Sequence, residues 1–128
     1  MAAFEPLAAG NAALTAHAGL PAINELLRPY ADWHALVDSW VVLMVDDTNV
    51  VFEWRAQAER KMRAAGRGGM SDAQVADFVG RYQPAYGAYL PGLYAAARGT
   101  GVGGQPTLAV RVDRERRPVN HLQGCSEP

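Results

Sequence analysis

The chain has one cysteine, one lysine and no long apolar run, and each shortage excludes a class of protein. The single Cys125 allows no intramolecular disulfide and no cysteine-rich zinc or iron–sulfur site. Lys61 is followed by Met62, so the sequence contains no Walker A loop, which requires a lysine followed by Ser or Thr. The longest apolar run, residues 40–45, is far shorter than the about 20 residues that cross a bilayer as a helix. Because the N-terminus also lacks a basic stretch, we expect a soluble cytoplasmic protein with no membrane partner.

The 128 residues are nearly neutral overall, but their charges are separated along the chain. Twelve basic residues oppose 13 acidic ones, and the net charge of −1 argues against a dedicated nucleic-acid-binding protein. Residues 1–54 carry seven acids and one base, whereas residues 55–67 carry five bases and one acid. This cationic block is therefore where we expect an anionic small ligand, if the chain binds one.

Two segments have the composition of β-strands. Residues 40–45, WVVLMV, form a continuous apolar run that predicts a strand buried on both faces, as in a parallel sheet covered by helices. Residues 107–112 predict a second strand, and the residues between the two have helical periodicity. We expect a mostly helical α/β fold with two core strands, about 38–46 and 107–112, paired in parallel.

A helix is predicted after the first strand, with Asp47 or Thr48 as its N-cap. One of its stripes is apolar, and the adjacent stripe is charged. The charged stripe is open to two interpretations: a solvated face with weak ion pairs, or a set of arginines that binds phosphate. The apolar stripe comprises Val50, Trp54, Ala58 and Met62, and the charged stripe Arg55, Glu59 and Arg63.

The following segment contains both helix and turn signals. Ser71 and Gln74 have the spacing of a capping box, which predicts the start of a helix. Helical periodicity then continues, with Pro84 expected to kink or split the helix and Pro91 to break it. Residues 99–106, GTGVGGQP, predict a flexible linker; they match GxGxxG but precede a strand, which disfavours a dinucleotide loop.

Other polar residues give weaker signals. Asp46 and Asp47 follow the first strand, where α/β proteins collect functional carboxylates, although helix capping is the competing interpretation. His17, His34 and His121 lack the spacing of metal ligands, so no metal site is predicted. These patterns leave the catalytic residues unassigned.

Three ordered strings carry a family resemblance. They are WRAQAE at residues 54–59, GMSD at 69–72 and RYQPAYGAYLPGLY at 81–94. With FEPL at 4–7 and INELL at 23–27, they resemble the C-terminal part of the D-glycerate 3-kinases, which are P-loop kinases related to phosphoribulokinase and uridine kinase. The resemblance covers roughly residues 4–119, and Asp47-Thr48 stands where the family has Asp-Pro.

The resemblance implies ATP-dependent phosphorylation of D-glycerate to 3-phosphoglycerate with Mg²⁺, in which a helical lid carrying arginines closes over the phosphates. Arg55 and Arg63, with Arg81 as a further candidate, occupy the matching basic positions. We expect Arg55 and Arg63 to contact phosphate or the substrate carboxylate. The family's P-loop and Mg²⁺ ligands are missing from this sequence, so we expect a partial P-loop kinase fold that is inactive alone.

We therefore expect a single partial domain over residues 1–128. Its parts are a helix and core strand (1–47), a helical lid-like segment (48–98), a linker and strand (99–119) and a tail (120–128). The expected partners are glycerate and either a separately encoded P-loop half or a second copy of the chain. The competing hypothesis is a non-catalytic module that binds an anion or a partner protein. A third hypothesis, binding of nucleic acid through the basic helix, has less support, because the acidic N-terminal segment repels phosphate.

Overall fold

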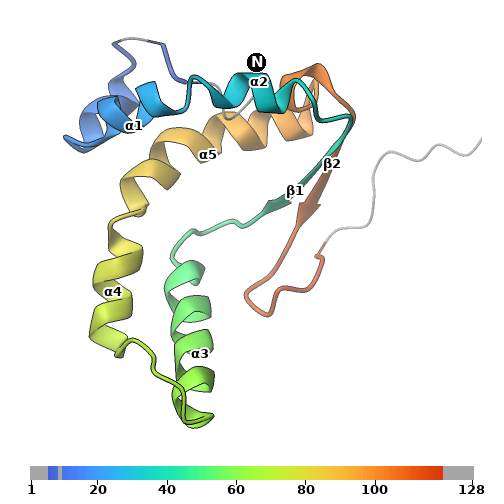
Figure 1. Cartoon of the computed structure of the whole chain (residues 1–128). Coiled ribbons are helices and arrows are strands. Elements are labelled where there is room, and N and C mark those ends of the chain that lie inside the picture. Colours follow the sequence, from blue (N-terminus) through green and yellow to red (C-terminus); the bar gives the residue numbers. More distant parts are fainter. Residues whose placement is uncertain (1–5, 9, 120–128) are drawn as a thin grey trace, which may run out of the picture.

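The computed structural model describes residues 6–8 and 10–119, and in these residues helices pack beside a small sheet (Figure 1). The predicted mixed fold, mostly helical with two parallel strands, is confirmed. In chain order the elements are η1 (Ala12–Ala16), α1 (Leu20–Leu26), α2 (Tyr30–His34), β1 (Trp40–Met44), α3 (Val50–Ala64), α4 (Asp72–Gly80), α5 (Gln83–Arg98), η2 (Val102–Gly104) and β2 (Thr107–Arg111), where η marks a 3-10 helix.

The sheet consists of β1 and β2, whose register runs from Trp40 opposite Thr107 to Met44 opposite Arg111. Both strands are shorter than expected. Helix α5 and η2 cover one face, where Leu93, Ala97 and Val102 pack against Val42 and Met44 of β1. This cluster is the main core of the described residues, and it fixes α5 against the sheet.

The other face of the sheet, which we call the outer face, is exposed. Its side chains Val41, Leu43 and Leu108 keep 65%, 63% and 42% of their surface in contact with solvent. The prediction that the first strand is buried on both faces was therefore wrong. An apolar run indicates that a strand suits burial on both sides, but burial of the outer face requires a second covering layer.

The glycine-rich segment 99–106 is a packed turn, and the prediction of a flexible linker was wrong. Val102 in its centre is fully buried. Gly101 has φ +87°, and a Cβ at this position would lie 2.1 Å from the Gln105 carbonyl oxygen. Its N–H donates to the Ala96 carbonyl at 2.9 Å, and the Thr107 hydroxyl accepts from the Val102 N–H at 2.9 Å. The glycine thus allows a tight turn that inserts Val102 into the core.

A second apolar cluster joins the N-terminal elements to α5. Leu14 of η1 and Leu20 of α1 pack against Ala88 of α5. Asn24 is 2% exposed, and its amide exchanges hydrogen bonds with the backbone of Leu7. The Tyr89 hydroxyl of α5 also donates to Asn24 Oδ1 at 3.0 Å, and burial raises the pKa of that hydroxyl.

Helices α3 and α4 form an antiparallel hairpin that extends away from the sheet (Figure 1). The predicted capping box at the start of α4 is confirmed: Ser71 Oγ accepts from the Gln74 N–H, and Gln74 Oε1 accepts from the Ser71 N–H. Pro84 lies in the first turn of α5, so it separates α4 from α5 as predicted. Pro91 lies inside α5 without ending it, so the predicted break there was wrong.

Candidate functional site

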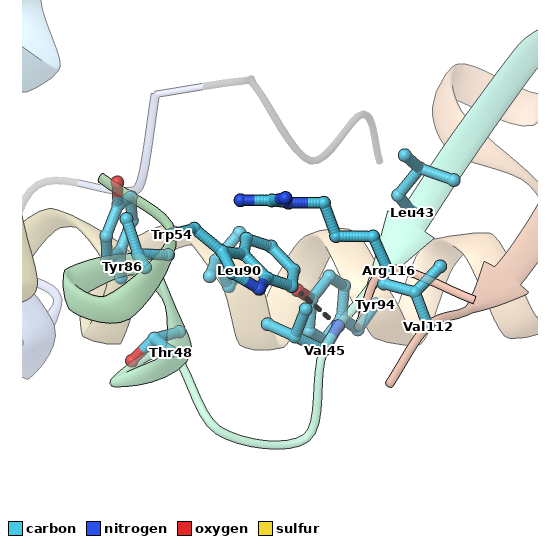
Figure 2. Close-up of a pocket in the computed structure, with 10 residues that line it drawn as sticks. Leu43, Val45, Thr48, Trp54, Tyr86, Leu90, Tyr94, Val112 and Arg116 are labelled. Atoms are coloured by element: carbon cyan, nitrogen blue, oxygen red, sulfur yellow. Dashed lines mark hydrogen bonds between the residues drawn. The ribbon is translucent and has the colours of Figure 1, made fainter. Parts of the chain in front are cut away.

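An apolar pocket of about 270 Å³ lies at the carboxyl ends of β1 and β2 (Figure 2). Ligands of open α/β sheets bind outside these strand ends, so we take this pocket as the candidate site. Most of the lining is apolar or aromatic, and one side chain carries a charge. The lining residues are Leu43, Val45, Thr48, Val51, Trp54, Tyr86, Leu90, Tyr94, Val112 and Arg116.

Trp54 of α3 and the turn after β2 form one wall of the pocket. The Trp54 indole N–H donates to the Arg114 carbonyl at 2.6 Å, and the Arg116 guanidinium lies 4.9 Å from the centre of the Trp54 ring. Arg116 has φ +63°, within a turn held by Asp113. The Arg117 N–H donates to the Asp113 carboxylate at 2.8 Å and lowers the pKa of that carboxyl. The wall therefore combines an aromatic face with one cation.

The opposite wall comes from α5. The Tyr94 hydroxyl accepts a hydrogen bond from the Val45 N–H at 3.3 Å, which joins α5 to the chain just after β1 (Figure 2). At the start of α3, the Thr48 hydroxyl donates to Gln83 Oε1 at 3.1 Å. The Gln83 amide nitrogen is buried and has no hydrogen-bond partner among the described residues. Most polar atoms around the pocket are thus already paired, and its interior suits an apolar ligand surface.

The two acids after β1 have structural partners. Asp46 pairs with Arg111 at the end of β2, and this hydrogen-bonded ion pair lowers the pKa of the Asp46 carboxyl. Asp47 Oδ1 accepts from the Asn49 N–H at 2.9 Å. Asn49 is the N-cap residue of α3, so the prediction of Asp47 or Thr48 at that position was wrong. Asp47 nevertheless binds a free amide at the start of α3, in keeping with the capping interpretation.

Arg55, Arg63 and Arg81 all lie outside the pocket lining. Arg55 and Arg63 belong to the same α3–α4 hairpin. Arg55 pairs with Glu59 at 2.5 Å and lies 5.4 Å from the centre of the Phe78 ring on α4. Arg63 donates to the Met70 carbonyl and lies 3.2 Å from Asp72.

Arg81 is separate from those two arginines. It follows α4, its side chain is 74% exposed, and it pairs with Asp77 at 2.6 Å. The structure therefore places two of the three candidate arginines on one hairpin and leaves the third in an exposed local pair.

The stripes predicted for α3 were only partly correct. Val50 is buried, but Met62 is 38% exposed and Ala58 is also exposed. Glu59, which the sequence placed on the charged stripe, is only 2% exposed. Its burial depends on partners from the α3–α4 turn, and helical spacing alone cannot identify them.

Two further observations on the described residues bear on function. In residues 6–8 and 10–119, no three His, Cys, Asp or Glu side chains come together in a way that could hold a metal ion. Within the same ranges, no helix is long and apolar enough to span a membrane. Cys125 and His121 lie outside the described residues. Sequence reasoning missed Trp54 and Arg116 as neighbours, because they are distant in the chain and no local motif links them.

Comparisons with known proteins show that the chain is similar to part of several kinases, although no protein-family model matches it. It is 43% identical over 120 residues to the chloroplastic D-glycerate 3-kinase of Arabidopsis thaliana, covering 93% of this chain and 26% of that protein. It is 33% identical over 87 residues to the probable ATP-dependent kinase TDA10 of Saccharomyces cerevisiae, covering 68% of this chain and 29% of TDA10.

Two solved structures have the same arrangement of elements. The YGR205w protein superposes with a TM-score of 0.75 at 31% identity, covering 92% of this chain and 43% of the solved one. D-glycerate 3-kinase from Cryptococcus neoformans superposes with a TM-score of 0.66 at 32% identity, covering 79% of this chain and 33% of the solved one. The chain thus spans less than half the length of the relatives it matches. It is homologous to the part of D-glycerate 3-kinase that these matches cover.

Proposed function

We propose that this chain is the arginine-bearing part of a kinase that transfers the γ-phosphoryl group of ATP to D-glycerate, giving 3-phosphoglycerate. The observation that carries the proposal is the arrangement of α3. This helix contributes Trp54 to the strand-end pocket and carries Arg55 and Arg63 on the adjoining hairpin. One helix therefore offers an apolar surface, which suits the base of a nucleoside triphosphate, and a set of cations, which suits its phosphates.

The pocket suits the base of ATP better than it suits glycerate. Glycerate consists almost entirely of hydroxyl and carboxylate groups, and an apolar lining removes water from such groups without replacing their hydrogen bonds. A planar base can instead stack on the Trp54 and Tyr86 side chains, which line the pocket. Arg116, over the Trp54 ring, adds a cation at the same wall.

The arginines suit the phosphate groups or the substrate carboxylate. Arg55 and Arg63 are 44% and 37% exposed, so an anion can reach both guanidinium groups. The partner of Arg63, Asp72, is itself 62% exposed, and such exposed pairs contribute little to stability. A multivalent phosphate can replace the Arg63–Asp72 pair at low cost. Arg81 remains a weaker candidate because its pair with Asp77 lies outside the hairpin contacts.

The binding test compares ATP with adenosine by calorimetry. Trp54→Ala is expected to weaken both ligands, whereas Arg55→Ala and Arg63→Ala are expected to weaken ATP and to leave adenosine unchanged. Arg28→Ala serves as the matched control, because Arg28 forms an exposed pair with Glu25 on another helix. Wild-type chain that binds neither ligand would contradict the assignment of the pocket and of the arginines.

The activity test uses ATP, Mg²⁺ and D-glycerate. We expect the purified chain to form no 3-phosphoglycerate, because the sequence contains no Walker A loop. A separately supplied P-loop half is expected to restore product formation. If phosphate-dependent binding is present but this addition restores no activity, the competing hypothesis of a non-catalytic anion-binding module is favoured.

Cytoplasmic localisation stays a prediction, which cell fractionation tests.

A further inference from the structure

Glu59 is a buried carboxylate at the centre of the α3–α4 hairpin. It is 2% exposed, and both of its oxygens are engaged. Oε1 lies 2.5 Å from the Arg55 guanidinium, and Oε2 accepts from the Met70 N–H at 2.8 Å. A carboxylate is removed from water only where charge and hydrogen bonds replace its hydration, and these two contacts supply that replacement.

The backbone of Met70 is held from both sides by side chains of α3. Glu59 accepts its N–H, and Arg63, one helical turn further on, donates to its carbonyl. Gly69 lies against the same carboxylate, because a Cβ there would be 3.1 Å from Glu59 Oε2 and 3.2 Å from the Glu59 carbonyl oxygen. The turn between α3 and α4 therefore lies so close to α3 that the Glu59 and Arg63 side chains both bind the backbone of Met70.

Three further contacts align the start and the C-terminal part of α4 with α3. Asp72, the first residue of α4, pairs with both Arg60 and Arg63. The Phe78 ring on α4 lies against the Arg55 guanidinium. Glu59 is the buried residue of this set, and it connects Arg55 directly with the backbone that holds Arg63.

We propose that Glu59 is a positioning residue that sets the separation and orientation of Arg55 and Arg63 for a phosphate-bearing ligand. This inference rests on the proposed function, since it assumes that these arginines bind the ligand's phosphates. Glu59 holds Arg55 directly and places Arg63 through Met70. It requires no contact with the ligand.

The two possible roles of Glu59 predict opposite changes in phosphate affinity when the residue is replaced by alanine. If Glu59 acts only as a negative charge beside Arg55, its removal makes the hairpin more cationic, so both Glu59→Ala and Glu59→Gln strengthen phosphate binding. If Glu59 positions the arginines, Glu59→Ala releases Met70 and Arg55 and weakens phosphate binding. Glu59→Gln retains an acceptor for the Met70 N–H but turns an amide NH₂ toward Arg55, so it keeps Arg63 in place, releases Arg55 and weakens binding less than Glu59→Ala does.

The experiment measures ATP and adenosine affinities for wild type, Glu59→Ala and Glu59→Gln, with Glu25→Ala as an exposed carboxylate control. The ratio of the two affinities isolates the phosphate contribution. We expect Glu59→Ala to lower this ratio about tenfold, as loss of the residues that support metal ligands does. Glu25→Ala should keep the wild-type ratio, Glu59→Gln should give a ratio between those of wild type and Glu59→Ala, and adenosine affinity should be unchanged in all variants.

Amide exchange at Met70, followed by NMR, gives a second readout that does not depend on the ligand. Exchange should accelerate in Glu59→Ala and remain slow in Glu59→Gln. An affinity ratio that stays at the wild-type value in Glu59→Ala, or that rises in both Glu59 variants, overturns the positioning role alone. Wild-type chain that binds ATP no more tightly than adenosine overturns the proposed phosphate binding and the positioning role together, even where Met70 remains protected.

Discussion

Substitution of Val102 by alanine tests whether the glycine-rich turn belongs to the core. Val102 is fully buried against β1 and α5. Removal of its two methyl groups loses about 0.8 kcal/mol each in transfer free energy. The remaining cavity adds about 1 kcal/mol, because a packed interior relaxes only in part. We therefore expect a loss of about 2–3 kcal/mol in the free energy of unfolding, which for a chain of this size lowers Tm by about 6–12 °C.

The measurement is urea unfolding followed by circular dichroism, on dilute protein, with a thermal scan alongside. Val41→Ala is the matched control, because this valine on the outer face is 65% exposed. Its effect should stay within about 0.5 kcal/mol. Equal effects of the two substitutions would refute the reasoning, since a flexible linker would place Val102 in solvent as well.

Three further predictions concern electrostatics, helix capping and the outer face. Arg111 holds the folded pKa of Asp46 below its ordinary value of 3.8, so the carboxylate stabilises the fold above pH 3.8 and loses this contribution as the pH falls through the lower folded value. Asp46→Asn should thus lower the urea midpoint at pH 7, and the difference from wild type should vanish in strong acid; a constant difference would contradict it. Ser71→Ala removes the capping box of α4 and should cost about 1 kcal/mol in thermal unfolding, whereas an unchanged Tm would show that the cap is dispensable. The outer face should drive concentration-dependent self-association in sedimentation, and Val41→Lys should reduce it; a monomer at high concentration counts against this prediction.

Local signals in the sequence predicted the elements well. The Ser71–Gln74 spacing specifies a cap through bonds within four residues, and the structure contains both of these bonds. The valine-rich run likewise gave β1, because β-branched residues suit a pleated strand in most contexts. Pro84 marked the boundary between α4 and α5, since its ring fits the first helical turn.

Features that depend on distant residues could not be predicted in this way. Glu59 is buried because Met70 and Arg55 replace its hydration, and nothing in a helical stripe specifies the Met70 amide. The glycines of 99–106 indicated flexibility, whereas Gly101 is required for the close approach that buries Val102. The pocket wall also joins Trp54 to Arg116, which are separated in the chain by α4, α5, η2 and β2. The resemblance to known kinases indicated the arginine positions without indicating their partners.

The parallel pairing of β1 with β2 determines the order in which the molecule can fold. The chain between the two strands contains α3, α4 and α5, so these distant segments meet only after a long loop has closed. Helices form from local contacts much faster than such closure occurs. The hairpin and α5 should therefore gain structure early, and formation of the sheet should limit the refolding rate. Substitutions that destabilise the hairpin or α5 would then slow refolding, because these elements are already formed when the strands meet, whereas substitutions of Val42 or Ala109 in the sheet would also accelerate unfolding.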